Sequence, residues 1–274
     1  MVKVTAAEVN NLRKTTGAGM MDCKKALVEA NGNFDAAIEI LRKKGQKVAA
    51  KRADRESSEG VAIAIANEDN SSAVGVVLAC ETDFVGKNED FISLAHKIAI
   101  AGLNCRTKEE LLQSKIDGMT IEQKLIEQTG VIGEKIQIND FSRIDADFVG
   151  TYIHAGNKIS SLVGFSNKCE NIEIAAKDIS MQIAAMNPIA LDEHSVDSVV
   201  IEKEIEIAKD QLRAEGKPEE ILDKIAQGKL KRFFKDNTLI HQAFIKDSKQ
   251  SVSQYLSSFS SETKITSYSR VSIG

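Results

Sequence analysis

The 274-residue sequence predicts an α+β fold with a small three-helix N-terminal domain, a two-part core of small antiparallel sheets covered by helices, and an inserted antiparallel helical hairpin. Three observations predict this fold. The first 45 residues show only helical spacing of apolar residues, two hairpin-then-helix units follow, and two polar helices with narrow apolar stripes come later. The expected domains are 1–54, 55–140, 141–191 together with 235–274, and the hairpin 192–234.

Three short helices account for the N-terminal domain. Thr5 and Glu8 form a capping-box pattern that starts the first helix, and Gly17 breaks the chain after it. Asn33 caps the third helix, and Gly45 is its expected stop. The second helix has these residues on its apolar face: Met20, Cys23, Ala26 and Leu27.

Charge is sorted along the chain. Residues 1–55 contain 12 Lys and Arg against 6 Asp and Glu, a formal charge of +6, and the remaining residues carry −10. The basic run at 42–55 is expected to be a charged helix end and linker, and it fits either a solvated face or a nucleic-acid patch. A basic head on an acidic body suits RNA or ribosome contact, or docking on two faces of a protein partner.

Two hairpin-then-helix units predict the core. The first pairs strands 61–65 and 73–80, and the second pairs strands 148–154 and 159–165 before a helix at 171–186. Each unit is expected to bury a small sheet under its helix. The helix of the first unit has apolar residues at helical spacing: Phe91, Leu94, Ala95, Ile98 and Ala101.

Two polar helices between residues 192 and 234 predict an antiparallel hairpin. Gly216 is the expected stop of the first helix, and Pro218 is the expected first residue of the second. Narrow apolar stripes leave most of each helix in water, so the hairpin should project, either as a structural protrusion or with a partner at its tip. The stretches 252–259 and 265–273 are expected to be strands that rejoin the second sheet.

The sequence lacks the patterns of enzymes, metal sites and nucleotide-binding loops. Its cysteines and histidines are too dispersed for CxxC or HExxH sites, and the cysteines are expected to be reduced, mostly buried thiols. The longest uncharged stretch, 179–191, has 13 residues, too few for a membrane helix, and no apolar signal segment opens the chain. We therefore expect a cytoplasmic protein that is not an enzyme and holds no cofactor, metal or nucleotide.

Two segments resemble the signatures of the bacterial elongation factor Ts family. Residues 12–27 read LRKTTGAGMMDCKKAL, and residues 80–87 read CETDFVGK. Val77, Ala79 and Gly86 stand where the family usually has Glu, Asn and a small Ala or Ser. The order of the pieces agrees over almost the whole chain, and the resemblance implies a UBA-like N-terminal domain. Many members continue into a C-terminal helical module, whose contacts are not expected in a chain ending at Gly274.

The resemblance implies a guanine-nucleotide exchange factor for elongation factor Tu, the GTPase that carries aminoacyl-tRNA to the ribosome. Such a factor binds the GDP-loaded GTPase, promotes release of GDP and exchange for GTP, and cleaves no bond. Because binding is linked, partner and nucleotide weaken each other's binding reciprocally. The implied partner is elongation factor Tu, both GDP-bound and nucleotide-free, and neither nucleic acid nor a membrane is expected.

The same resemblance implies the site residues. Phe84 would be a wedge between helices of the partner near its Mg²⁺ and phosphate site, and Asp83 the polar anchor that fixes its entry, within a partner-binding segment that also contains Thr82 and Val85. Arg13, Met20 and Met21 match positions that touch the nucleotide-binding domain of the partner. His154 matches a position near the partner's other domains.

Structural alternatives remain for these residues. Phe84 and the two methionines could be core side chains, Asp83 a carboxylate favoured at a helix start, and His154 a structural histidine. Two other functions also remain. A ribosome- or RNA-associated protein using the basic head would show RNA affinity that falls steeply with salt. An enzyme with an unrecognised site would turn over a small molecule.

Overall fold

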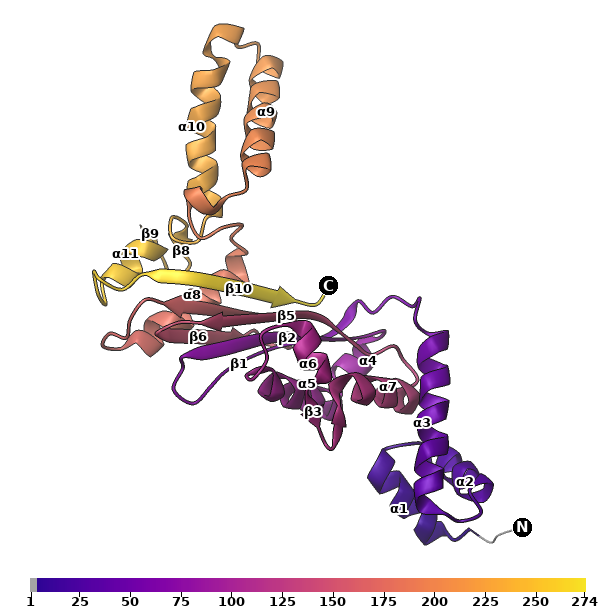
Figure 1. Cartoon of the computed structure of the whole chain (residues 1–274). Helices are drawn as coiled ribbons and strands as arrows, with labels where there is room; N and C mark the ends of the chain where they lie inside the picture. The colour runs from indigo at the N-terminus through magenta and orange to yellow at the C-terminus, as the bar shows by residue number, and fades with distance from the viewer. Residues whose placement is uncertain (1–3) are drawn as a thin grey trace.

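The computed structural model describes residues 4–274; Met1–Lys3, the first residues of the expected N-terminal domain, lie outside the described residues. Figure 1 shows a group of N-terminal helices at one end, sheets in the middle and a long helical hairpin that projects from them. The predicted α+β class is confirmed. Within residues 4–274, no helix is both long and apolar enough to cross a membrane.

The N-terminal helices begin and end largely where local signals predict. The Thr5 hydroxyl accepts the N–H of Glu8, whose carboxylate accepts the Thr5 N–H at 2.7 Å, so the capping box is confirmed. Gly17 ends the first helix with φ +70°. Leu12 and Leu27 are buried in the small core of this bundle. The helices are α1 (Ala6–Thr16), α2 (Met20–Glu29) and α3 (Phe34–Lys51).

Gly45 does not end the third helix, and the prediction of a stop there is wrong. Helix α3 continues to Lys51, so most of the basic run lies on a helix. Gly45 is buried against Gly130 of α7 (Ile121–Ile132). A β-carbon on Gly130 would come within 2.5 Å of the Gly45 α-carbon. The glycine is therefore needed for the close approach of two helix backbones and not for helix termination.

The first sheet has three antiparallel strands in the order β1-β2-β5. The hairpin β1 (Glu59–Ala66) and β2 (Ser72–Cys80) is as predicted, but β5 (Gln137–Asp145) was not predicted. Strand β5 alternates poorly between buried and exposed residues, which explains why its pattern was missed. The apolar face is covered by α5 (Glu89–Gly102). The intervening elements are α6 (Lys108–Gln113), β3 (Lys115–Ile116), β4 (Met119–Thr120) and α7.

The second sheet has the order β10-β7-β6 and is also antiparallel. Its strands are β6 (Phe148–Ile153), β7 (Ile159–Phe165) and β10 (Ile265–Ser272), and its covering helix is α8 (Ile172–Met186). The hairpin, the helix and the return of the C-terminal strand are as predicted. The two sheets contact each other through side chains that include Val77 and Ala79 of β2 with Val271 and Ile273. Apolar residues therefore suit the two positions at which β2 departs from the family signature.

The segment 252–259 is not a strand, so that prediction is wrong. Residues Val252–Ser257 form helix α11, because Ser251 and Gln254 make a capping box that starts it. Val252 and Leu256, four residues apart, are buried on one helix face against the second core. Two short strands precede this helix: β8 (Ala243–Phe244) and β9 (Asp247–Ser251).

The projecting hairpin consists of α9 (Ser198–Ala214) and α10 (Glu219–Asn237), preceded by the short 3₁₀ helix η1 (Glu193–Ser195) (Figure 1). Gly216 has φ +73° after the first helix, as predicted. Pro218 is the N-cap residue and not the first helical residue as predicted. The two helices bury one narrow stripe between them: Ala208, Leu212, Leu222, Ala226 and Leu230.

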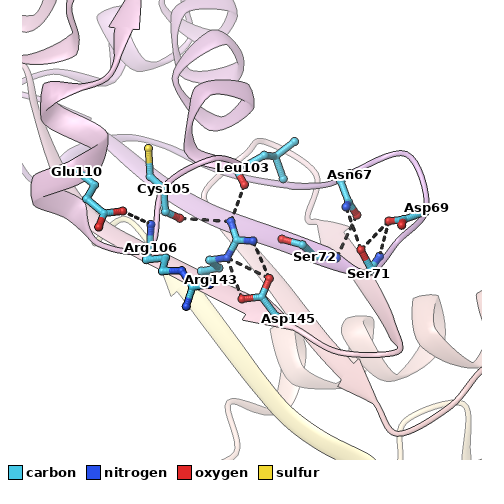
Figure 2. Close-up of polar contacts among 10 residues, drawn as sticks. All are labelled: Asn67, Asp69, Ser71, Ser72, Leu103, Cys105, Arg106, Glu110, Arg143 and Asp145. Carbon is cyan, nitrogen blue, oxygen red and sulfur yellow. Dashed lines mark hydrogen bonds and ion pairs between the residues drawn. The ribbon is translucent and has the colours of Figure 1, made fainter.

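Arg143 of β5 fastens the loop between α5 and α6 to the first sheet (Figure 2). Its guanidinium donates to the carbonyl oxygens of Leu103 at 2.5 Å and Cys105 at 3.3 Å. It also donates to both carboxylate oxygens of Asp145, two residues along the strand. One planar donor fork thus satisfies two backbone carbonyls of the loop that follows α5.

Candidate functional site

Phe84 is a surface residue in a part of the chain where the neighbouring apolar side chains are buried or half-buried. It lies on the one-turn helix α4 (Asp83–Gly86), which connects β2 to α5. Its side chain is 84% exposed, the highest value among the large apolar residues found exposed. The alternative of a core aromatic residue is therefore contradicted. An aromatic side chain held in water at this level is typical of an interaction site.

The neighbours of Phe84 hold α4 down on the core. Val85 is half-buried and packs against the first hydrophobic core. Gly86 is buried, and a β-carbon on it would lie 3.2 Å from the Gly60 α-carbon in β1. A glycine suits this position because α4 and β1 meet backbone to backbone, which explains the departure from the usual Ala or Ser. Phe84 consequently faces solvent while the residues after it face the core.

Asp83 carries a paired carboxylate beside Phe84. The Lys87 ammonium donates to the carboxylate at 2.6 Å, from four residues further along the chain. This hydrogen bond and the charge of Lys87 hold the pKa of Asp83 below its usual range, so the carboxylate is ionised at neutral pH. Both side chains are exposed, so the pair is available to another molecule. Lys87 was not predicted, although its spacing from Asp83 could have indicated the pair.

The Thr82 side chain points toward the loop that contains Glu134. Its hydroxyl donates to the Glu134 carboxylate at 2.7 Å, and its N–H donates to the same carboxylate at 3.0 Å. Glu134 was not predicted, because it lies 52 residues from Thr82 and belongs to no local pattern. Thr82 and Val85 thus fix the segment, whereas Asp83 and Phe84 are its accessible residues.

The three predicted head residues all lie on the surface. Arg13 is exposed in the last turn of α1. Met20 and Met21 begin α2 and are 55% and 62% exposed, so the placement of Met20 on the apolar face is wrong. The buried face of α2 is formed by Cys23, Ala26 and Leu27. Two exposed methionines side by side provide a flexible apolar contact surface.

A groove of about 660 Å³ lies between the N-terminal helices and the core. Gly17 from the end of α1, Phe84 from α4 and Val131 from α7 all contribute to its lining. The two signature segments, which are separated by about 50 residues in the sequence, therefore meet along one concave surface. The close contact of α3 with α7 fixes this arrangement.

His154 lies apart from this groove. It directly follows β6 of the second sheet and is exposed, with its Nδ1 3.1 Å from the Tyr152 hydroxyl. Of the predicted residues, Phe84 and Val85 line the groove. Arg13, Met20 and Met21 lie on the N-terminal helices outside its lining, and His154 lies on the second half of the core.

The accessible side chains of the site suit binding to another molecule. Among residues 4–274, no three His, Cys, Asp or Glu side chains gather in an arrangement that could hold a metal ion. Cys80, just before the segment, is buried, and burial raises the pKa of its thiol to about 12. The accessible groups are an apolar ring and an ion pair, which suit insertion into another protein.

Comparison with known proteins finds one family model that matches most of the chain and relatives that match its full length. Residues 81–274 match the family described as elongation factor TS. The chain is 63% identical to elongation factor Ts of Christiangramia forsetii and 59% identical to that of Flavobacterium psychrophilum, in both cases covering the full length of both chains. It is 46% identical to elongation factor Ts of Cytophaga hutchinsonii, again over the full length of both.

Proposed function

The chain belongs to the elongation factor Ts family, and we propose that it acts on its partner through the exposed Asp83–Phe84 pair. The function of the chain is guanine-nucleotide exchange on elongation factor Tu: it binds the GDP-loaded GTPase and promotes replacement of GDP by GTP. It is an exchange factor and not a catalytic enzyme. The family also places it in the cytoplasm. The predicted family, partner and function are confirmed.

Physical chemistry indicates where such a factor must act. A P-loop GTPase holds its nucleotide mainly through backbone N–H groups, a lysine and Mg²⁺ around the phosphates. A group that disturbs this region weakens nucleotide binding, and by linkage the nucleotide weakens binding of the factor equally. A tenfold effect corresponds to about 1.4 kcal/mol. Complete burial of a phenylalanine side chain supplies roughly 1.5–3 kcal/mol, which is sufficient.

The observation that supports the proposal is the 84% exposure of Phe84 within the family signature. We propose that Phe84 enters between helices of elongation factor Tu and that Asp83 fixes its entry. The resulting shift would displace Mg²⁺ and loosen the phosphates. Thr82 and Val85 would belong to the same partner-binding segment, because they attach it to Glu134 and to the first hydrophobic core.

Further contacts would extend this interface. We propose that Arg13, Met20 and Met21 bind the nucleotide-binding domain of the partner, and that His154 binds near its other domains. The exposure of all four side chains supports these roles. Interfaces on two parts of one chain would allow it to hold two regions of the GTPase at a fixed separation.

Release of fluorescently labelled GDP from elongation factor Tu tests the wedge. Phe84→Ala should lower the exchange rate at least about tenfold, because the apolar contact is lost, while circular dichroism stays unchanged. Ile100→Ala, at a position on α5 that is 60% exposed, is the control and should exchange at the wild-type rate. Wild-type release rates for a folded Phe84→Ala would disprove the wedge role.

A further inference from the structure

Glu134, in the loop between α7 and β5, grips the backbone from which α4 begins. Its carboxylate accepts the N–H of Glu81 at 3.1 Å, the N–H of Thr82 at 3.0 Å and the Thr82 hydroxyl at 2.7 Å. Gly133 ends α7 with φ +84°, and this left-handed residue turns the chain so that Glu134 follows directly. Three hydrogen bonds to one carboxylate are a strong local restraint.

The loop before α4 and the loop between α7 and β5 each accept hydrogen bonds from the other. The Glu81 carboxylate accepts the N–H of Lys135 at 2.6 Å and the Arg52 guanidinium at 2.7 Å. The Lys135 ammonium in turn donates to the carbonyl oxygens of Ala53 and Arg55. Burial alone would raise the pKa of Glu81, but the hydrogen bonds from the Lys135 N–H and the Arg52 guanidinium hold this pKa below its usual range. The end of the basic run is therefore fastened to the loop that precedes α4.

We propose that Glu134 is a positioning residue of the exchange reaction, which fixes Thr82 so that Asp83 and Phe84 are presented to elongation factor Tu. This inference rests on the role proposed above for Phe84. Because Phe84 is 84% exposed, its own side chain makes few contacts that could orient it. Its direction must come from the backbone on both sides. Gly86 supplies the attachment after it, and Glu134 supplies the attachment before it.

The use of the Thr82 hydroxyl supports this role. Thr82 is the N-cap residue of α4, a position where the side chain commonly accepts an N–H of the helix. Here Thr82 makes no such cap, and its hydroxyl donates to Glu134. The one-turn helix is thus started by a contact from a distant loop. Without that contact a smaller fraction of molecules would present Phe84 correctly, and apparent activity would fall by that fraction.

Two variants of Glu134 test the proposal in the labelled-GDP release assay. Glu134→Ala removes the three acceptor contacts and should slow release roughly tenfold. Glu134→Gln keeps the size of the side chain and one acceptor oxygen, so it should fold as wild type and show a smaller loss. In both variants, hydrogen exchange should report loss of protection at the amides of Glu81 and Thr82.

The matched control is Glu110. Its carboxylate also accepts a loop N–H, that of Arg106 at 2.7 Å (Figure 2). Glu110→Ala removes one hydrogen bond between a carboxylate and a loop N–H away from α4 and should exchange nucleotide at the wild-type rate.

A double variant separates positioning from general stability. If Glu134 acts through Phe84, adding Glu134→Ala to Phe84→Ala should slow release by less than about twofold more. An equal loss in both backgrounds would overturn the proposal, as would wild-type release rates for both Glu134 variants. If Phe84→Ala is slow while the Glu134 variants are normal, only the positioning role fails. If Phe84→Ala itself is normal, the wedge role fails first.

Discussion

Gly45 of α3 and Gly130 of α7 touch backbone to backbone: a β-carbon placed on Gly130 would lie 2.5 Å from the Gly45 α-carbon. This contact joins the N-terminal helices to the core (Figure 1). It therefore sets the distance between the exposed residues of the head and Phe84 on the core.

Gly130→Ala should force α3 and α7 apart. We expect it to lower the free energy of unfolding by about 1–3 kcal/mol, because there is no flexible side chain to yield. The matched control is Gly228→Ala on α10, where a β-carbon would meet nothing within 4 Å; it should be neutral or stabilising by up to about 1 kcal/mol. Urea denaturation measures both. Equal stabilities for the two variants would contradict the backbone contact.

Arg143→Met should destabilise the protein by about 1–3 kcal/mol, because the carbonyls of Leu103 and Cys105 lose their donor (Figure 2). Arg143→Lys should rescue little, since one ammonium cannot replace the planar fork. Arg232→Met removes an exposed ion pair of 3.5 Å on α10 and should change stability by less than about 0.5 kcal/mol. Thermal unfolding distinguishes these outcomes, and full stability in Arg143→Met would refute the anchoring role.

The double substitution Met20→Ala/Met21→Ala should weaken binding to nucleotide-free elongation factor Tu roughly tenfold, because two apolar contacts are lost. Stability should stay near the wild-type value, since both side chains are exposed at the start of a helix. Isothermal titration calorimetry measures the affinity. Ile245→Ala, another exposed apolar position, is the control. Unchanged affinity in the double variant would remove the methionines from the interface.

The thiol of Cys80 should make stability decline in alkali. Burial raises its pKa to about 12 in the folded protein, against about 8.5 in an unfolded chain. The unfolded chain therefore loses its proton first, so the contribution of the neutral thiol is complete below about pH 8.5 and is lost as pH rises toward 12. Urea titrations between pH 7 and 10 should show a shallower decline for Cys80→Ala. Parallel slopes would contradict the raised pKa.

Local signals allowed much of the fold to be predicted. The Thr5 capping box, the turn before β2 and the αL residue Gly216 depend on interactions between residues a few positions apart. Such interactions can be read from spacing and residue type. The long apolar periodicity of α5 was equally clear, because a helix buried on one face repeats its pattern over several turns.

Errors arose where contacts between distant segments decided the outcome. Glycine commonly follows the end of a helix, so the sequence predicts a stop at Gly45. Only the approach of Gly130 explains why a glycine stands there within a continuous α3. Strand β5 has few alternating apolar residues and is held in the sheet by pairing with β2. The error at 252–259 has a local cause instead: its apolar residues suit either strand or helix, and the capping box of Ser251 and Gln254 starts a helix there.

The sequence by itself determined the family, the fold class and the segment that contains Phe84, because those follow from contiguous residues and periodic patterns. The tertiary structure decided that Phe84 is exposed and that the Glu134 carboxylate accepts hydrogen bonds from Glu81 and Thr82. It also brought the end of α1 and Phe84 to one groove. These features depend on chain segments about 50 or more residues apart, whose packing and hydrogen bonds leave no periodic trace in either segment alone.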